Sequence, residues 1–202
     1  EEFGQEPGSL LFHHLAAVLK TIGIDQVIDL GVCVDILLLE EAYELLTRIK
    51  SKKQLPMLSS SSPAWVKYIE HFYPDYLPNV STAKSPQQMF GALIKTWYAE
   101  KNNIDPEDIV SVALMPCTAK KFECNRPEMR DSGFQDVDYG LTTRELAKMI
   151  RESGINLPDM PQSDFDNPFG TASGSGVIFA ATGGVMEAAL RSVLEFVTGK
   201  KV

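Results

Sequence analysis

Residues 109–123 read IVSVALMPCTAKKFE, and the change of pattern inside this stretch indicates how the chain folds. The first seven residues are apolar or small, as in a buried strand, and Pro116 ends that run. The residues that follow place Cys117, Lys120 and Glu123 at helical spacing, on one face of a turn. A buried strand, a polar turn and a helix in this order predict a parallel α/β sheet, in which ligands bind at the carboxyl ends of the strands.

The rest of the chain alternates in the same way between helical periodicity and short apolar runs. We expect helices over residues 9–22, 34–50, 63–72, 86–101, 143–153 and 185–197. We expect strands over 26–30, 55–59, 109–115 and 177–182, and a long loop over 155–176. Capping patterns mark two helix starts, Ser85-Pro86-Gln87-Gln88 and Thr142-Thr143-Arg144-Glu145. The predicted class is α/β, with mostly parallel sheets flanked by helices.

Three loops follow predicted strands and should therefore meet at one edge of the sheet. They are LSSSSPAW (58–65), MPCTAKKFE (115–123) and TGG (182–184). The serine run has two interpretations. It is an ordinary polar loop, or it is a loop that once held more reactive side chains. No GxSxG turn and no nearby histidine base support a serine hydrolase.

Composition narrows the class of protein. The 202 residues are 44% apolar, enough for one large domain or two small lobes. A net charge of −8 argues against general binding to nucleic acid or to anionic membranes, and no apolar run approaches the roughly 20 residues of a spanning helix. Three irregularly spaced cysteines favour reduced thiols and a cytoplasmic location. The missing initiator methionine and the end just after an apolar helix lead us to expect a piece of a longer chain.

Two groups of residues have both a plain and a functional interpretation. Cys117 is a buried structural thiol near two solvated charges, or a thiolate favoured by Lys120 that binds metal. Glu41, Glu44 and Arg48 share one helix face. They form a solvated surface with one ion pair, or a row of carboxylates that passes protons into a buried site.

Several segments together closely resemble the catalytic, H-cluster domain of the iron-only (FeFe) hydrogenases. They are LPMLSSSSPAW (55–65), KSPQQMFGALIK (84–95), MPCTAKKFE (115–123), LTTRELAKMI (141–150) and VIFAATGGVMEAALR (177–191). The resemblance implies the iron-hydrogenase catalytic-domain fold for a fragment spanning 1–202. About 1–140 would form the first lobe, with the serine loop and the MPC motif, and about 141–202 would form part of an incomplete second lobe.

In that family the domain binds an H-cluster, a 4Fe-4S cluster joined to a di-iron centre, and reversibly reduces protons to hydrogen. Electrons come from ferredoxin or from fused iron–sulfur domains. The resemblance places Ser61 where the family has its proton-relay cysteine, and Ser62 where it has a cluster-ligand cysteine. Cys117 matches a second cluster ligand, and the sequence lacks the C-terminal motif that supplies the other two.

Other positions match the family. The resemblance implies a proton pathway with Arg48 at its outer end and a cofactor pocket next to it. The implied catalytic set is Ser61, Glu41, Glu44, Ser81 and Glu123, and the implied cofactor-binding set is Lys120, Met115, Gln87 and Phe179. Ala180 and Cys124 stand where the family has Gly and Ala.

Ser61 and Ser62 determine whether we expect this chain alone to bind the H-cluster. Iron–sulfur clusters need thiolate ligands, and a hydroxyl is harder to deprotonate and a poorer partner for iron. We therefore expect no H-cluster and no hydrogen turnover in the isolated chain, and self-association through exposed core surface. The alternative is a non-catalytic relative, a hydrogenase-like sensor or an iron–sulfur assembly protein, which Ala180 and Cys124 favour. An unrelated binding module is the third interpretation.

Overall fold

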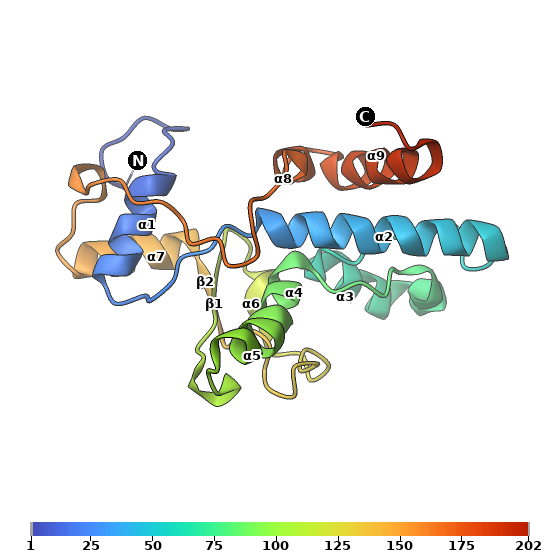
Figure 1. Cartoon of the computed structure of the whole chain (residues 1–202), viewed down its shortest axis with the longest axis horizontal. Helices are drawn as coiled ribbons and strands as arrows, with labels where there is room; N and C mark the ends of the chain where they lie inside the picture. The colour runs from blue at the N-terminus through green and yellow to red at the C-terminus, as the bar shows by residue number, and fades with distance from the viewer. Residues whose placement is uncertain (1, 202) are drawn as a thin grey trace.

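A long helix, α2 (Gly31–Ser51), carries other helices on both sides (Figure 1). The computed structural model describes residues 2–201, so Glu1 and Val202 of the predicted 1–202 range lie outside it. Helices α8 (Ser175–Phe179) and α9 (Gly184–Thr198) pack along one side of α2. Helix α4 (Pro86–Leu93) packs against α2 as well, on its other side in Figure 1.

A second group of elements lies at the other end of the molecule (Figure 1). It contains α1 (Phe12–Thr21), α7 (Thr143–Glu152) and the short 3₁₀ helix η4 (Leu157–Asp159). Their apolar faces meet in one core cluster, made of Ala16, Val18, Leu19, Val27, Leu146, Ile150 and Leu157. The amino-terminal helix therefore packs with elements from beyond residue 140, and α8 and α9 return to α2. The division into lobes near residue 140 stays a prediction, and packing crosses it.

A short parallel sheet lies between the two groups. Strand β1 (Val112–Met115) pairs with β2 (Tyr139–Thr142), from Val112 opposite Tyr139 to Met115 opposite Thr142. Helix α6 (Ala119–Cys124) follows β1, and α7 follows β2. The α/β class with parallel pairing is thus confirmed. Sequence patterns missed β2, because YGLT is short and carries a central glycine, which is unfavourable in strands.

The expected helices are present, with bounds shifted by a few residues. Helix α3 (Pro63–Phe72) has the predicted range and leads into the 3₁₀ helix η1 (Pro74–Asn79). The predicted helix 86–101 consists of α4, a π-helical turn η2 (Ile94–Tyr98) and α5 (Ala99–Asn102). A 3₁₀ turn, η3 (Pro106–Asp108), precedes β1. No helix within residues 2–201 has the length and apolar character that crossing a membrane requires.

The predicted strand 177–182 is wrong, because its first residues belong to helix α8, which packs on α2. A short apolar run does not by itself distinguish a strand from a buried helix. The predicted strands 26–30 and 55–59 are reduced to isolated parallel bridges, Ile28 with Asp166 and Leu58 with Val80. In the first case the Asp166 side chain accepts the Val27 amide at 2.8 Å, so a side chain takes the place of a ladder partner.

The two capping patterns have different outcomes. At α7 the Thr142 side chain accepts the Glu145 amide, and the Glu145 carboxylate accepts the Thr142 amide, so this capping box is confirmed. At α4 the Ser85 hydroxyl makes no capping bond and donates instead to Glu123 Oε2 at 2.8 Å. The amide of Gln88, the matching third residue, is buried without a hydrogen-bond partner among the described residues.

A close backbone contact between Gly91 of α4 and Asp136 supplies a test of how α4 packs in the fold. A Cβ there would lie 2.2 Å from the carbonyl oxygen of Asp136. We expect Gly91→Ala to lower the free energy of unfolding by about 1–3 kcal/mol, because the backbone must shift to relieve the overlap. Urea denaturation measures the change. Gly174→Ala is the matched control, since nothing lies within 4 Å of its added Cβ, and equal effects of the two substitutions would contradict the packing.

Candidate functional site

The serine loop is fastened to α2 through a buried carboxylic acid. The Ser59 hydroxyl donates to Glu41 Oε1 at 2.8 Å, and the Ser59 and Ser61 Oγ atoms lie 3.3 Å apart. The hydroxyl of Ser60 turns the other way and donates to the carbonyl of Ala83. Two of the predicted site residues, Glu41 and Ser61, are thus joined through a serine that sequence reasoning did not single out.

Burial determines the protonation of Glu41, which is 2% exposed. Desolvation raises the pKa of its carboxyl above the ordinary value, and the hydrogen bonds from Ser59 and the Ser60 amide oppose this only in part. The negative charge of nearby Glu44 raises the pKa further. Glu41 therefore holds its proton more strongly than an exposed glutamate, as an acid in a proton pathway should.

Glu44, one turn further along α2, has the opposite character. Burial alone would raise the pKa of its carboxyl, but hydrogen bonds from Ser81 and Arg48 outweigh that effect and lower it. The Ser81 hydroxyl donates to Oε2 at 2.7 Å, and Arg48 Nη2 donates to Oε1 at 2.6 Å. Two carboxylates with pKa values displaced in opposite directions thus lie one turn apart on one helix.

Arg48 is buried and holds the chain on either side of the serine loop. Its guanidinium donates to the carbonyls of Gln54, Asn79 and Val80 at 2.8–3.1 Å, in addition to Glu44. These bonds fix the segment that carries Ser81 against α2. No hydrogen bond within the described chain joins Ser81 to Glu41, so the residues of the predicted pathway form an outer and an inner hydrogen-bonded group with one gap between them.

A second buried network occupies α6 and the start of α4. Three donors converge on Oε2 of Glu123, namely Lys120 Nζ at 3.0 Å, Ser85 Oγ at 2.8 Å and Gln87 Nε2 at 3.2 Å. Lys120 Nζ also donates to the carbonyl oxygen of Ser61 at 3.1 Å. The loop after β1 and the serine loop therefore meet, as the sequence predicted.

The third predicted loop does not share this arrangement. Residues 182–184 connect α8 to α9 and follow no strand, so the prediction that three strand ends converge is wrong for this one. Phe179 still lies near the residues that hold the serine loop. It packs against the cluster of Cys33, Leu37, Ala83 and Met89, and the Ala83 carbonyl accepts the Ser60 hydroxyl. Its position depends on α8 resting on α2, and not on a shared sheet edge.

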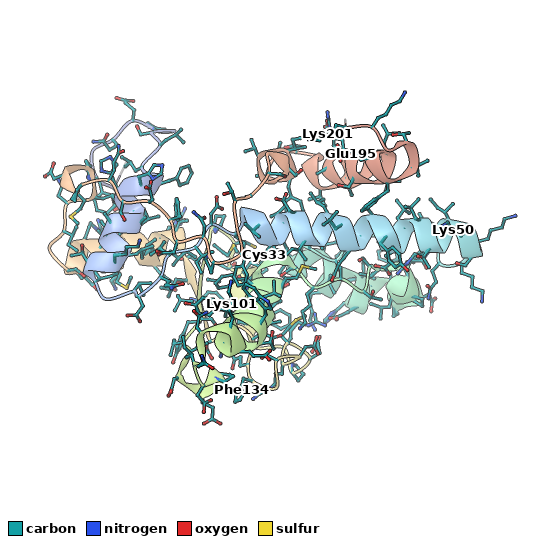
Figure 2. The ribbon with its side chains drawn as sticks, viewed as in Figure 1. Cys33, Lys50, Lys101, Phe134, Glu195 and Lys201 are labelled. Carbon is teal, nitrogen blue, oxygen red and sulfur yellow. The ribbon has the colours of Figure 1, made fainter. Side chains whose placement is uncertain are left out.

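The potential metal-binding residues form a sparse set. Cys117 is exposed in the turn between β1 and α6, Met115 is half-buried at the end of β1, and Ser62 is exposed before α3. Cys33 lies near the start of α2 (Figure 2), where burial raises the pKa of its thiol to about 12. No group of three or more His, Cys, Asp or Glu residues with metal-binding geometry occurs within residues 2–201.

Sequence reasoning missed two hydroxyls that complete these networks, Ser59 and Ser85. Ser59 was one of four serines without a distinguishing local pattern, and its partner lies 18 positions away in the sequence. Ser85 was interpreted as a helix cap, and its partner lies 38 positions away. No signal in the sequence pairs these positions, because hydrogen bonds at such separations depend on tertiary structure.

Comparisons with known proteins agree with this geometry. A family model described as the iron only hydrogenase large subunit, C-terminal domain, matches residues 1–202. The NADP-reducing hydrogenase subunit HndD of Solidesulfovibrio fructosivorans is 46% identical over 99% of this chain and 35% of its own length. The structure of apo [FeFe]-hydrogenase HydA1 from Chlamydomonas reinhardtii, variant C377H, superposes with a TM-score of 0.87 at 42% identity, over 100% of this chain and 51% of that one.

A relative named as a cluster assembly factor also matches. The cytosolic Fe-S cluster assembly factor narfl of Xenopus tropicalis is 37% identical over 78% of this chain and 35% of its own length. This chain spans about a third to a half of the length of the curated relatives it matches.

Removing the Arg48 guanidinium tests whether it organises the site. We expect Arg48→Met to lower the free energy of unfolding by about 3 kcal/mol, because it leaves a partly buried carboxylate and several carbonyls without their donor. Arg191→Met is the matched control, because its ion pair with Glu187 lies on an exposed face of α9, and it should change stability by less than about 0.5 kcal/mol. Urea denaturation of both variants measures the difference, and similar losses would contradict the assignment.

The raised pKa of Glu41 predicts a pH-dependent effect of Glu41→Gln. Native Glu41 binds its proton more tightly than the unfolded chain does, so its contribution to stability is present at low pH and is lost as pH rises through the native pKa. Glutamine keeps a neutral side chain, so the variant should gain stability relative to wild type as pH rises above 4.5, the ordinary pKa of the carboxyl, and through the raised native pKa. Glu40→Gln, at an exposed position on the same helix, should show no such gain in parallel denaturation curves.

Proposed function

Because the chain belongs to the family of the iron-only hydrogenase large subunit, C-terminal domain, we propose that it is the proton-conducting part of a hydrogenase catalytic domain. In the proposed reaction, protons are reversibly reduced to hydrogen. The observation that carries this proposal is a pair of carboxylates on α2, the buried Glu41 and the partly buried Glu44, each hydrogen-bonded to a serine. Glu41 is also linked through Ser59 to Ser61.

The outer part of the pathway takes up protons and the inner part delivers them. Arg48 keeps Glu44 ionised, so Glu44 can take up a proton from solvent and pass it from Oε2 to the Ser81 hydroxyl, which takes this proton on its oxygen and gives up its own toward Glu41. The protonated acid Glu41 then exchanges its proton with Ser59, and Ser59 with Ser61. Movement of a side chain or a water bridges the gap between Ser81 and Glu41.

The residues of this chain do not fit the family's cluster by themselves. A four-iron cluster takes four thiolates, and the site offers one exposed thiol, Cys117, together with the hydroxyls of Ser61 and Ser62. We propose that the isolated chain holds no H-cluster and that its role is limited to positioning Lys120 and moving protons. The further ligands that the resemblance implies would come from polypeptide outside residues 1–202.

The proposal extends to partners and location. The free thiols Cys33, Cys117 and Cys124 support a reducing compartment, the cytoplasm, and electrons would come from ferredoxin or fused iron–sulfur domains. The apolar side chains on α8 and α9 support contact with more polypeptide, either the remainder of the domain or a second copy of the chain. The most exposed of them are Val177, Met186, Phe196 and Val197.

A second candidate is a non-catalytic iron–sulfur assembly protein or a hydrogenase-like sensor. The similarity to narfl supports it, as do the serines at positions 61 and 62. The hydrogen-bonded networks of Glu41 and Glu44 favour the hydrogenase, because a protein that only carries clusters needs no row of acids leading to one point.

A chimera tests the proposal. This chain would replace the matched segment of the HndD subunit, once with its own serines and once with Ser61→Cys and Ser62→Cys. We expect hydrogen evolution from the cysteine chimera and none from the serine chimera, because thiolates hold iron and relay protons where hydroxyls do not. Adding Glu44→Gln to the cysteine chimera should lower the rate by about tenfold or more.

Iron and acid-labile sulfide are measured in the same chimeras and in the isolated chain after anaerobic reconstitution. A stoichiometric four-iron cluster in the isolated chain would overturn the proposed ligand deficit. A cysteine chimera that holds full iron and sulfide but evolves no hydrogen would favour the assembly protein or sensor.

A further inference from the structure

A surface pocket of about 330 Å³, open to solvent, shares no residue with the proton network or with the potential metal-binding residues. Three segments that are far apart in the sequence form it. Its polar lining consists of Gln26, Tyr98, Lys101, Asn102, Asp166 and Asn167. This volume is at the lower end of the range typical of small-molecule sites, so the pocket has room for a compact ligand.

The walls of this pocket are fastened to one another by contacts within the chain. The Asp166 amide donates to the Val27 carbonyl at 2.7 Å, and the Val27 amide donates to the Asp166 carboxylate at 2.8 Å. Phe169, in the same loop as Asp166, packs against Trp97 and Tyr98, with ring centroids 5.4 and 6.4 Å apart. The pocket therefore exists before a ligand binds, as small-molecule sites usually do.

An unpaired positive charge lies at this pocket. Lys101 (Figure 2) places its Nζ atom 4.4 Å from the centre of the Trp97 ring, an attractive contact that limits where the ammonium group can move. Among residues 2–201, no carboxylate forms an ion pair with Lys101. Trp97 belongs to the π-helical turn η2, and such turns are rare and occur frequently at functional sites. In a chain with a net charge of −8, this pre-positioned cation is available to an anion from outside.

The acidic residue of the pocket does not compete for this cation. The Asp166 carboxylate is paired with Lys20 at 3.1 Å and accepts the Val27 amide. The Tyr98 hydroxyl and the Gln26 side chain have no hydrogen-bond partner in the described part of the chain. The pocket therefore offers an ammonium, a hydroxyl and an amide, and each of these groups can donate a hydrogen bond to an oxygen anion.

We propose that this pocket binds a small organic oxyanion, a carboxylate or a phosphate, with Lys101 as its charge partner. Tyr98 and Gln26 donate further hydrogen bonds to the anion, and the rest of the volume takes its organic part. A single charge-assisted contact at a solvent-open site gives weak binding, so we expect a dissociation constant of about 1 mM. This site is independent of the proposed function and requires no cluster.

Titrations of the full chain, followed by nuclear magnetic resonance of its backbone and side-chain amides, test the site. The probes are succinate and glycerol 3-phosphate, each compared with sodium chloride at equal ionic strength. At least one probe should cause saturable shifts confined to Gln26 and residues 98–102 and 166–169, and the probe that does so identifies the preferred oxyanion. Inorganic phosphate should bind about tenfold more weakly than the better organic probe, because it leaves most of the pocket unfilled.

Substitutions of Lys101 test its role as the charge partner. Lys101→Met keeps an apolar stem beside Trp97 and removes the charge, so it should weaken binding by about tenfold. Lys101→Arg keeps the charge and should bind within about threefold of wild type. Lys50→Met is the matched control, because Lys50 is an exposed lysine at the far end of α2 (Figure 2), and it should leave binding unchanged.

The absence of saturable shifts with both organic probes would overturn the inference, as would equally tight binding of inorganic phosphate. Wild-type affinity in Lys101→Met, or an equal loss in Lys50→Met, would also overturn it. Both lysines are exposed, and an unchanged amide spectrum outside the pocket verifies that each variant is folded. Because binding is measured on the chain alone and without iron, a failure here is distinguishable from a failure of the chimera.

Discussion

A single buried guanidinium holds the parts of the site together. Arg48 neutralises Glu44 on its own helix and binds the carbonyls of Asn79, the last residue of η1, and of Val80, which begins the segment after it. That segment delivers the Ser81 hydroxyl to Glu44, and two residues later the Ala83 carbonyl to Ser60. The Arg48 guanidinium thus helps to position the serine loop indirectly, through the segment that carries Ser81 and Ala83. A rigid planar donor suits this task better than lysine, because its fork satisfies several acceptors in one plane.

In the proposed function, an intact proton network lies beside an altered set of metal donors. Serine and cysteine differ by one atom and have nearly the same shape, so exchanging them changes the coordination chemistry without forcing the loop to rearrange. The carboxylates depend on burial and on partners that the exchange leaves in place. In the proposed function, proton transfer and iron binding are therefore separable.

Sequence patterns predicted the helices well, because their amphipathic period survives in the folded chain. They failed where structure depends on a distant partner. The strand β2 exists because β1 lies beside it, and 177–182 becomes helical because α2 offers an apolar face. The resemblance to a family selected residues that the structure joins by hydrogen bonds, such as Glu44 with Ser81 and Lys120 with Glu123, and their roles stay predictions. It could not show that Ser59 bridges Glu41 and Ser61, or that Ser85 donates to Glu123, because both depend on three-dimensional contacts.

The start of α4 shows a conflict between stability and chemistry. Ser85 gives its hydroxyl to Glu123 and leaves the first turn of the helix without a side-chain cap, while the buried Gln88 amide has no partner in the described part of the chain. Such local frustration is what natural selection tolerates where function requires it. A redesign that ranked substitutions only by folding energy would repair this helix end first, and in doing so would detach the carboxylate from its network.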